Sequence, residues 1–254
     1  MVNDNQRSSS NSITIFHQNI CGLKGKTGEL ISSMSPHFPH ILCSSECHLK
    51  KFELYQINVN GYRLGTAHCR QVVKRCSVCI FVPENLSYTN IVLGKHCKDQ
   101  EKEVCVLKLK STFFNCIVAV YRAPTGNFNL FLNRLDDIIK TLHKVELNLT
   151  ICGDVNEDCL TDNDKRRQLD AVLLTYNLSA IVYFPTRSQG YSSTEIDNIF
   201  IDTYKFINCT VSPLYNGLLD HDDPLLEICN VNLQLQNYHI FTIRNITIYS
   251  IEDF

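Results

Sequence analysis

Short apolar runs that each end in a polar side chain limit the folds open to this chain. The clearest spans 147–158, where a strand-like run stops at Gly153 and opens onto Asp154 and Asn156. Side chains alternate along an extended segment, so this carboxylate and this amide point the same way and could face one water or one phosphate. Gly, Asp and Asn are also common in turns, so the motif alone fits an ordinary strand-to-loop turn.

Other apolar runs in the chain end in the same way. Their polar ends are Asn19, Glu46, Tyr121, Asp197, and Asp220 with His221. Each one alone is explained as a turn former, a solvated strand end or a surface loop. Open α/β sheets, however, place ligands at the carboxyl ends of their strands. Together these groups suit a hard cation such as Mg²⁺, a positioned water and a bound phosphate.

Strands outnumber helices in the predicted secondary structure. Period-2 and apolar runs predict strands at 13–19, 41–46, 77–82, 103–109, 113–121, 147–151, 193–200 and 209–213. Helical spacing of apolar residues predicts helices at 29–34, 128–142 and 165–176. The runs 103–109 and 113–121 lie close enough to form a hairpin. The sequence has no internal repeat and no evident linker, so these elements are expected to form an α/β fold.

Bulk composition allows a sizeable core and gives no support for a nucleic-acid partner. The chain has 254 residues, 44% hydrophobic content and a net charge of −2. A nucleic-acid binder usually has a basic bias, although local patches can replace it. Thirteen cysteines without a secretory signal in 1–12 indicate reduced thiols and an intracellular protein that is not secreted. Five N-x-S/T motifs point the other way, but chance produces them in an Asn-rich chain. No apolar run is long enough for a membrane span.

Six motifs in order carry a resemblance to a known family. They are HQNICGL, SSECHL, YRAPTGN, CGDVNED, FPTRSQGYSSTEIDNIF and LLDHDDP. Together they resemble the endonuclease/exonuclease/phosphatase superfamily and, within it, the apurinic-type endonuclease domain of non-LTR retrotransposons. The resemblance covers 13–231 and implies a DNase-I-like, four-layer α/β sandwich of two packed, mostly antiparallel sheets flanked by helices. Residues 1–12 are expected to be disordered, and 232–254 to be a tail that begins a truncated linker.

The resemblance also implies roles in binding metal and phosphate. Glu46 would hold Mg²⁺, with Mn²⁺ as an alternative, helped by Asn19 and Asp220. Asn156 and Tyr121 would bind the scissile phosphate. No other cofactor is expected.

Further roles follow from the same resemblance. Asp154 would orient or deprotonate the attacking water. His221 would contact the phosphate or transfer a proton, with Asp197 as its orienting partner. Thr186 or Ser193 would touch the DNA backbone. Which of Asp154 and His221 is the general base stays open.

The expected function is that of a Mg²⁺-dependent endonuclease that nicks double-stranded DNA in the nucleus. The chain would be a fragment of a retroelement polyprotein without its reverse-transcriptase domain. One alternative is the same fold acting on another phosphoester, such as RNA, a phosphoinositide or a sphingolipid. Another is an inactive domain that only binds nucleic acid or protein. A zinc module through Cys69, Cys76, Cys79 and Cys97 is a weaker alternative, because no second tight pair of cysteines follows.

Overall fold

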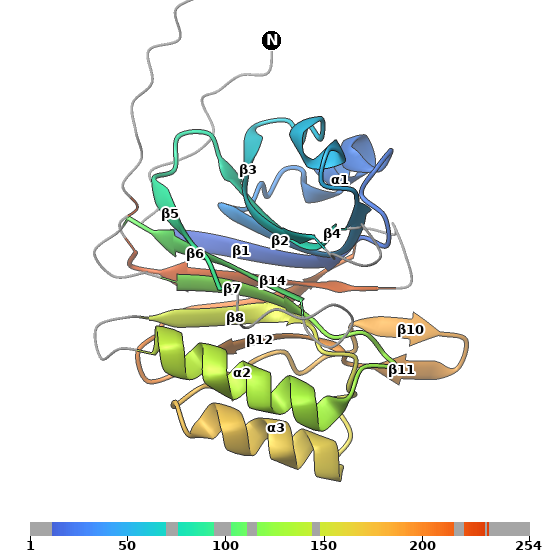
Figure 1. Ribbon diagram of the computed structural model, residues 1–254, viewed down its shortest axis with the longest axis vertical. Helices are drawn as coiled ribbons and strands as arrows, with labels where there is room; N and C mark the ends of the chain where they lie inside the picture. Colours follow the sequence, from blue (N-terminus) through green and yellow to red (C-terminus); the bar gives the residue numbers. More distant parts are fainter. Residues whose placement is uncertain are drawn as a thin grey trace, which may run out of the picture.

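Two six-stranded sheets pack face to face, with helices on their outer faces (Figure 1). The structure is a computed structural model. It describes residues 12–69, 76–93, 103–110, 116–143, 148–215, 221–231 and 233, without the side chains of Cys69, Cys76 and Ser77. Helix α1 (Thr27–Met34) covers one sheet, and α2 (Phe128–Leu142) and α3 (Asp164–Leu174) cover the other. This arrangement confirms the predicted four-layer sandwich.

The strands of both sheets are mostly antiparallel. In order across the first sheet they are β13 (Cys209–Leu214), β14 (Asp223–Cys229), β1 (Ser12–Asn19), β2 (Ile41–Leu49), β4 (Cys76–Pro83) and β3 (Tyr62–Cys69). In order across the second they are β5 (Tyr88–Ile91), β6 (Glu103–Leu109), β7 (Cys116–Tyr121), β8 (Leu149–Asp154), β12 (Asp197–Ile201) and β9 (Ser179–Ala180). Only β1 with β2 and β7 with β8 pair in parallel among the described strands.

Two smaller elements complete the described part of the chain. A short 3₁₀ helix, η2 (Glu53–Tyr55), follows β2. A two-stranded hairpin of β10 (Arg187–Gln189) and β11 (Ser192–Thr194) projects from the sandwich (Figure 1). No described helix is long and apolar enough to cross a membrane.

Alternation along the strands divides the core into layers. On β1, Ile13 and Ile15 are fully buried between the two sheets, whereas Phe16 faces α1. On the second sheet, apolar residues of α2 and α3 pack against the outer face. Asn127 caps α2, because its side chain accepts a hydrogen bond from the Leu130 amide at 3.0 Å. The space between the sheets is therefore lined by alternate residues of each strand.

Most predicted elements agree with the structure, and the differences have local causes. The predicted strand 193–200 is divided into β11 and β12, and β8 extends to Asp154. Strands β3, β5, β9, β10 and β14 were not among the predicted strands. Tyr62–Cys69 lacks a continuous apolar run, and Tyr88–Ile91 has no buried residue. The predicted disordered segment 1–12 lies outside the described residues, except for Ser12, which begins β1. The predicted tail 232–254 also lies outside them, except for residue 233.

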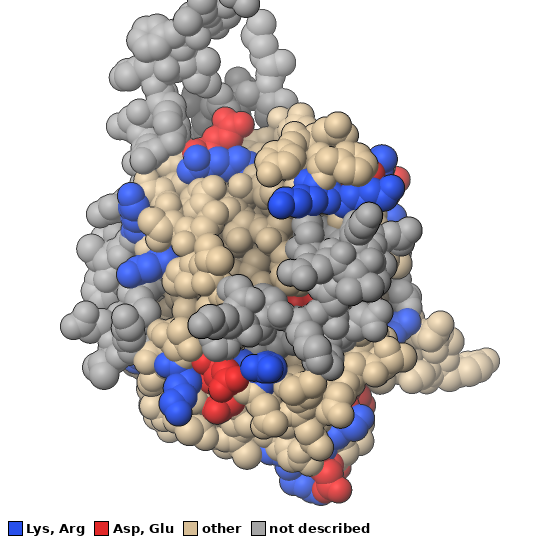
Figure 2. Space-filling view, viewed as in Figure 1, with Lys and Arg blue, Asp and Glu red and all other residues tan. Residues whose placement is uncertain are grey.

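The charged side chains form no single large patch on the face drawn in Figure 2. Lys and Arg lie in several separate groups there, some with Asp or Glu beside them. The projecting end of the hairpin is uncharged in this view. This distribution agrees with the near-neutral net charge of the sequence.

The described cysteines are free, as predicted. Cys79 is buried in β4 and forms no disulfide. The other three cysteines of the alternative zinc module, Cys69, Cys76 and Cys97, lie outside the described side chains.

Gly153 allows β7 and β8 to lie side by side in parallel. A Cβ atom at this position would stand 1.9 Å from the carbonyl oxygen of Val120, its register partner. We expect Gly153→Ala to lower the free energy of unfolding by at least about 2 kcal/mol, because the backbone itself must move. Urea unfolding measures the loss. Gly28→Ala in α1 is the control, since nothing lies within 4 Å of its Cβ position. Equal stability of the two variants would contradict this prediction.

Candidate active site

The candidate site lies at one end of the space between the two sheets. Strands β1, β7 and β8 each direct alternate residues into the space between the sheets. The last residue of each strand lies on this inward side and is polar: Asn19 on β1, Tyr121 on β7 and Asp154 on β8. Asp197 begins β12 and lies in register opposite Asp154, because these two strands are antiparallel. The same alternation that builds the core therefore directs four predicted site residues into one region.

Hydrogen bonds join predicted site residues across the two sheets. The Asn19 side-chain nitrogen, from the first sheet, donates to Asp154 Oδ2 at 2.9 Å, from the second. The Tyr121 hydroxyl, from the second sheet, donates to Glu46 Oε1 at 2.9 Å, from the first. The structure thus brings together residues that lie 135 and 75 positions apart in the sequence.

Asp154 is a buried carboxyl group held at both oxygens. Its Oδ1 accepts a hydrogen bond from the Asn156 amide at 2.8 Å, and its exposed fraction is 1%. Burial raises the pKa of Asp154 well above its ordinary value, and the nearby charges of Asp197 and Glu46 raise it further. The hydrogen bonds from Asn156 and Asn19 oppose this rise. Such a carboxyl group either takes up a proton or, when it is ionised, is stabilised by a nearby cation.

Glu46 stands on a backbone irregularity of β2. Pairing with β4 shifts register between Ser45 and Leu49, and both Glu46 and His48 have positive φ angles, 51° and 54°. Residues other than glycine adopt this conformation at some energetic cost, and such strain is often found at functional sites. The bulge leaves the Glu46 side chain half-buried, with Oε2 3.8 Å from His48 Nε2.

The donor set fits a hard divalent cation. Among the described residues no group of three His, Cys, Asp or Glu forms a ready metal site. Mg²⁺, however, needs only one or two carboxylates and keeps several waters. Glu46 supplies one such carboxylate, and its repulsion with the nearby Asp154 is a cost that a cation would offset. Asn19 Oδ1 already accepts a hydrogen bond from the Cys21 amide at 3.2 Å. Asp220, the third predicted metal ligand, lies outside the described residues.

His221 and Asp197 form a buried pair, as the sequence predicted. His221 Nδ1 lies 2.8 Å from Asp197 Oδ2, and the two side chains are 7% and 0% exposed. When Asp197 is ionised it can only accept, so this contact places a proton on Nδ1 of the ring. The backbone of Arg187 bridges that of His221, which ties this loop to the base of the β10–β11 hairpin.

Thr186 has a structural role at the start of β12. Its hydroxyl accepts hydrogen bonds from the amides of Ile196 and Asp197, both at 3.0 Å, and its side chain is fully buried. A hydroxyl in this position fixes the start of β12 and offers no surface to a DNA backbone. The burial of Thr186 favours Ser193 for the predicted contact with the DNA backbone, which stays a prediction.

The remaining predicted phosphate ligands stay predictions. The Asn156 side-chain nitrogen donates to the Arg122 carbonyl at 2.8 Å, which leaves its second N–H for another acceptor. The Tyr121 ring is 5% exposed, and its hydroxyl contacts Glu46. Ser193 is exposed on β11, with its hydroxyl 3.4 Å from that of Ser188.

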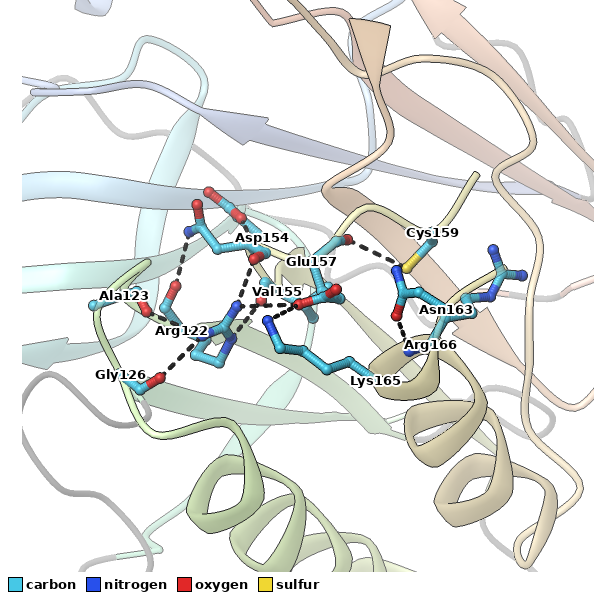
Figure 3. Close-up of polar contacts among 11 residues, drawn as sticks. Arg122, Ala123, Gly126, Asp154, Val155, Glu157, Cys159, Asn163, Lys165 and Arg166 are labelled. Carbon is cyan, nitrogen blue, oxygen red and sulfur yellow. Dashed lines mark hydrogen bonds and ion pairs between the residues drawn. The ribbon is translucent and has the colours of Figure 1, made fainter. Parts of the chain in front are cut away.

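Arg122 holds the loop that follows Asp154 (Figure 3). The sequence did not predict this role. Its Nε donates to the Val155 carbonyl at 2.6 Å, and its two terminal nitrogens donate to the carbonyls of Gly126 at 3.1 Å and Asn156 at 2.5 Å. The guanidinium also lies 3.9 Å from Glu157 and is 3% exposed. The sequence offered one indication of this role: in YRAPTGN, Arg122 directly follows the predicted phosphate ligand Tyr121.

We expect Arg122→Met to lower the free energy of unfolding by about 3 kcal/mol, since several buried carbonyls lose their donor. Amide hydrogen exchange should show the loop at Asn156 opening more often. Lys165→Met is the matched control, because Lys165 also contacts Glu157, at 3.0 Å, but is 55% exposed. That control should change stability by about 0.5 kcal/mol or less. Similar losses for both variants would show that the carbonyl contacts contribute little.

Another buried carboxyl group, Glu195, lies two residues before Asp197. Burial raises the pKa of Glu195 from 4.5 to about 9, with Arg166 opposing the rise and Asp197 adding to it. The folded protein therefore holds this proton more tightly than the unfolded chain does. Its stability should fall as the pH increases from about 4.5 to about 9.

Because glutamine resembles the protonated side chain, Glu195→Gln should be more stable than the parent protein at pH 8, by more than about 1 kcal/mol. The difference should shrink toward pH 4.5. Thermal or urea unfolding across this range measures it, with the exposed Glu227→Gln of β14 as the control. A difference that does not vary with pH would refute the raised pKa of Glu195.

Comparisons with solved structures agree with this architecture. The endonuclease domain of TRAS1, a telomere-specific non-LTR retrotransposon, has a TM-score of 0.68 and 16% identity, over 86% of this chain and 98% of that chain. The AP endonuclease LMAP from Leishmania major has a TM-score of 0.63 and 12% identity, over 86% and 88%. A mannosyl-6-phosphatase from Bacteroides thetaiotaomicron has a TM-score of 0.58 and 12% identity, over 84% and 98%.

No protein-family model matches the chain, and no curated protein does. At the identities above, the structural likeness establishes the fold. The similar structures are nucleases and phosphatases, and their two-sheet sandwich is the one described above. The chain therefore has the DNase-I-like fold of the endonuclease/exonuclease/phosphatase proteins.

Proposed function

We propose that this chain is a divalent-metal-dependent phosphodiesterase that nicks double-stranded DNA. The observation that carries the proposal is the meeting of three carboxylates from both sheets at one end of the sandwich, each with a partner that orients it. Glu46 contacts Tyr121, Asp154 contacts Asn19, and Asp197 contacts His221. A structural role alone would not explain why acidic side chains that repel one another are held together.

In this proposal Glu46 holds the cation, Mg²⁺ or Mn²⁺, with Asn19 and Asp220 as the further ligands that the resemblance implies. A bound divalent cation supplies charge stabilisation at the phosphoryl oxygens and makes a coordinated water more acidic. The Tyr121 hydroxyl fixes the orientation of the Glu46 carboxylate through its contact with Oε1.

Asp154 is suited to take a proton from the attacking water. Its burial and its acidic neighbours raise its pKa, which makes it a stronger base than an exposed aspartate. Hydrogen bonds from Asn19 and Asn156 to its two oxygens prevent the carboxylate from rotating. The second N–H of Asn156 is available for a phosphate oxygen.

His221 is suited to contact the phosphate through Nε2. Asp197 accepts from Nδ1, so the orientation of the ring is fixed, and the phosphate contact is assigned to the opposite nitrogen, Nε2. In the protonated ring Nε2 donates to a phosphate oxygen, and in the neutral ring it accepts a proton. The pair serves either of the two general-base assignments that the sequence left open.

Double-stranded DNA is the proposed partner, and the nucleus is the proposed place of action. The TRAS1 endonuclease domain shares the fold and belongs to a retrotransposon, which supports a retroelement origin for this chain. The β10–β11 hairpin projects beside His221, with Ser193 exposed and the Tyr191 ring fully exposed at its tip. These groups could contact a DNA backbone. The separate basic groups in Figure 2 are consistent with modest, salt-sensitive binding.

Nicking of supercoiled plasmid with Mg²⁺ or Mn²⁺ tests the proposal, and a chelator should abolish it. We expect Glu46→Gln and Asp154→Asn each to lower the nicking rate by at least about 100-fold, because each removes a group that acts on the phosphate or the water. Glu227→Gln, an exposed change on β14, should retain the rate.

An absence of nicking with either metal would reject the proposal. DNA binding that persists without nicking would then favour an inactive binding domain. Release of phosphate from another phosphoester under the same conditions would favour a different substrate.

A further inference from the structure

The alternation that leads to Asn19 also places a histidine in the space between the sheets. On β1, Ile13 and Ile15 face the inner core, and His17 is the next residue on that face. Its side chain is 1% exposed. Neither the resemblance nor the proposed mechanism gives it a role. A polar ring in this apolar row needs an explanation, because buried polar groups are normally hydrogen-bonded.

His17 faces the side of Asp197 that His221 does not occupy. His17 Nδ1 lies 3.6 Å from Asp197 Oδ1, whereas His221 Nδ1 lies 2.8 Å from Asp197 Oδ2. Neither ring nitrogen of His17 has a hydrogen-bond partner, and Asp197 Oδ1 has none either. His17 Nδ1 and Asp197 Oδ1 are therefore two buried atoms without partners that face each other. Their separation exceeds a normal hydrogen-bond distance by less than about 1 Å.

The chemistry of the two groups is complementary. A neutral imidazole ring has one N–H to donate, and an ionised carboxylate can only accept. A small movement of the ring would satisfy both groups at once.

We propose that His17 is a positioning residue, which donates its Nδ1–H to Asp197 Oδ1 so that Oδ2 stays directed at His221. This role deepens the proposed function and rests on it. With donors at both oxygens, the Asp197 carboxylate cannot rotate, just as Asn19 and Asn156 together fix Asp154. Thr186 contacts only the backbone amide of Asp197, so it cannot replace this restraint on the side chain.

Nuclear magnetic resonance of the ¹⁵N-labelled protein, without metal or DNA, tests the contact itself. We expect His17 to be neutral with its proton on Nδ1, and this proton to exchange slowly with water. Asp197→Asn should shift its resonance, whereas the exposed Glu227→Gln on β14 should not. A proton on Nε2, or a resonance unaffected by Asp197→Asn, would overturn the proposal.

Nicking kinetics test the role. Leucine has a similar size and no donor, whereas the side-chain nitrogen of asparagine lies near the position of Nδ1. We expect His17→Leu to lower kcat by at least about 10-fold with KM within about twofold, and His17→Asn to recover most of that loss. Ile15→Ala opens a cavity in the same core row and controls for loss of stability; below its melting temperature it should retain kcat.

The double variant separates positioning from general stability. If His17 acts through Asp197, then His17→Leu should have no further effect on kcat in the Asp197→Asn protein. Additive losses, or an asparagine variant no better than leucine, would overturn the proposed role. If the parent protein does not nick DNA, the proposed function fails, and the resonance experiment still decides whether His17 donates to Asp197.

Discussion

Asp154 places an ionisable carboxyl group where the two sheets meet, and its surroundings supply the hydrogen bonds that such burial requires. Asn19 reaches it from the opposite sheet, and the Asn156 amide reaches it from the loop that follows. Burial of an unpaired charge would be strongly destabilising, so these contacts are a condition of the fold as well as of the site. Gly153, just before it, allows β7 and β8 to approach closely enough to deliver Tyr121 and Asp154 side by side.

A further set of residues holds the backbone on which the site stands. Arg122 donates to carbonyls of the loop after β8, and Thr186 accepts from two amides at the start of β12. Both are buried, so these contacts are shielded from water and persist. Precise placement of reacting groups requires such support, because a shift of about 1 Å can greatly reduce a rate.

The buried acidic groups in and beside the site lower the stability of the folded protein when they are ionised. The pKa values of Asp154 and Glu195 are raised mainly by burial, and Asp197 adds to the rise of both. Stability is therefore lost as these groups ionise with increasing pH. Sites that bind cations commonly carry this cost, because the charges that repel one another in the free protein are the ones that attract the ligand.

Sequence alone determined that most of the strands form and that several of their apolar runs end in polar side chains, because both follow from local alternation of apolar and polar residues. It thereby grouped Asn19, Tyr121, Asp154 and Asp197 as candidate site residues, and it predicted the amphipathic helix α2. Tertiary structure alone decided which partner each side chain meets. The burial of Thr186, the carbonyl contacts of Arg122 and the approach of His17 to Asp197 all depend on how the two sheets and their loops pack. Contacts between residues more than a hundred positions apart, such as Asn19 with Asp154, leave no periodic trace in the chain, because periodicity records a residue's own strand and not the strand packed against it.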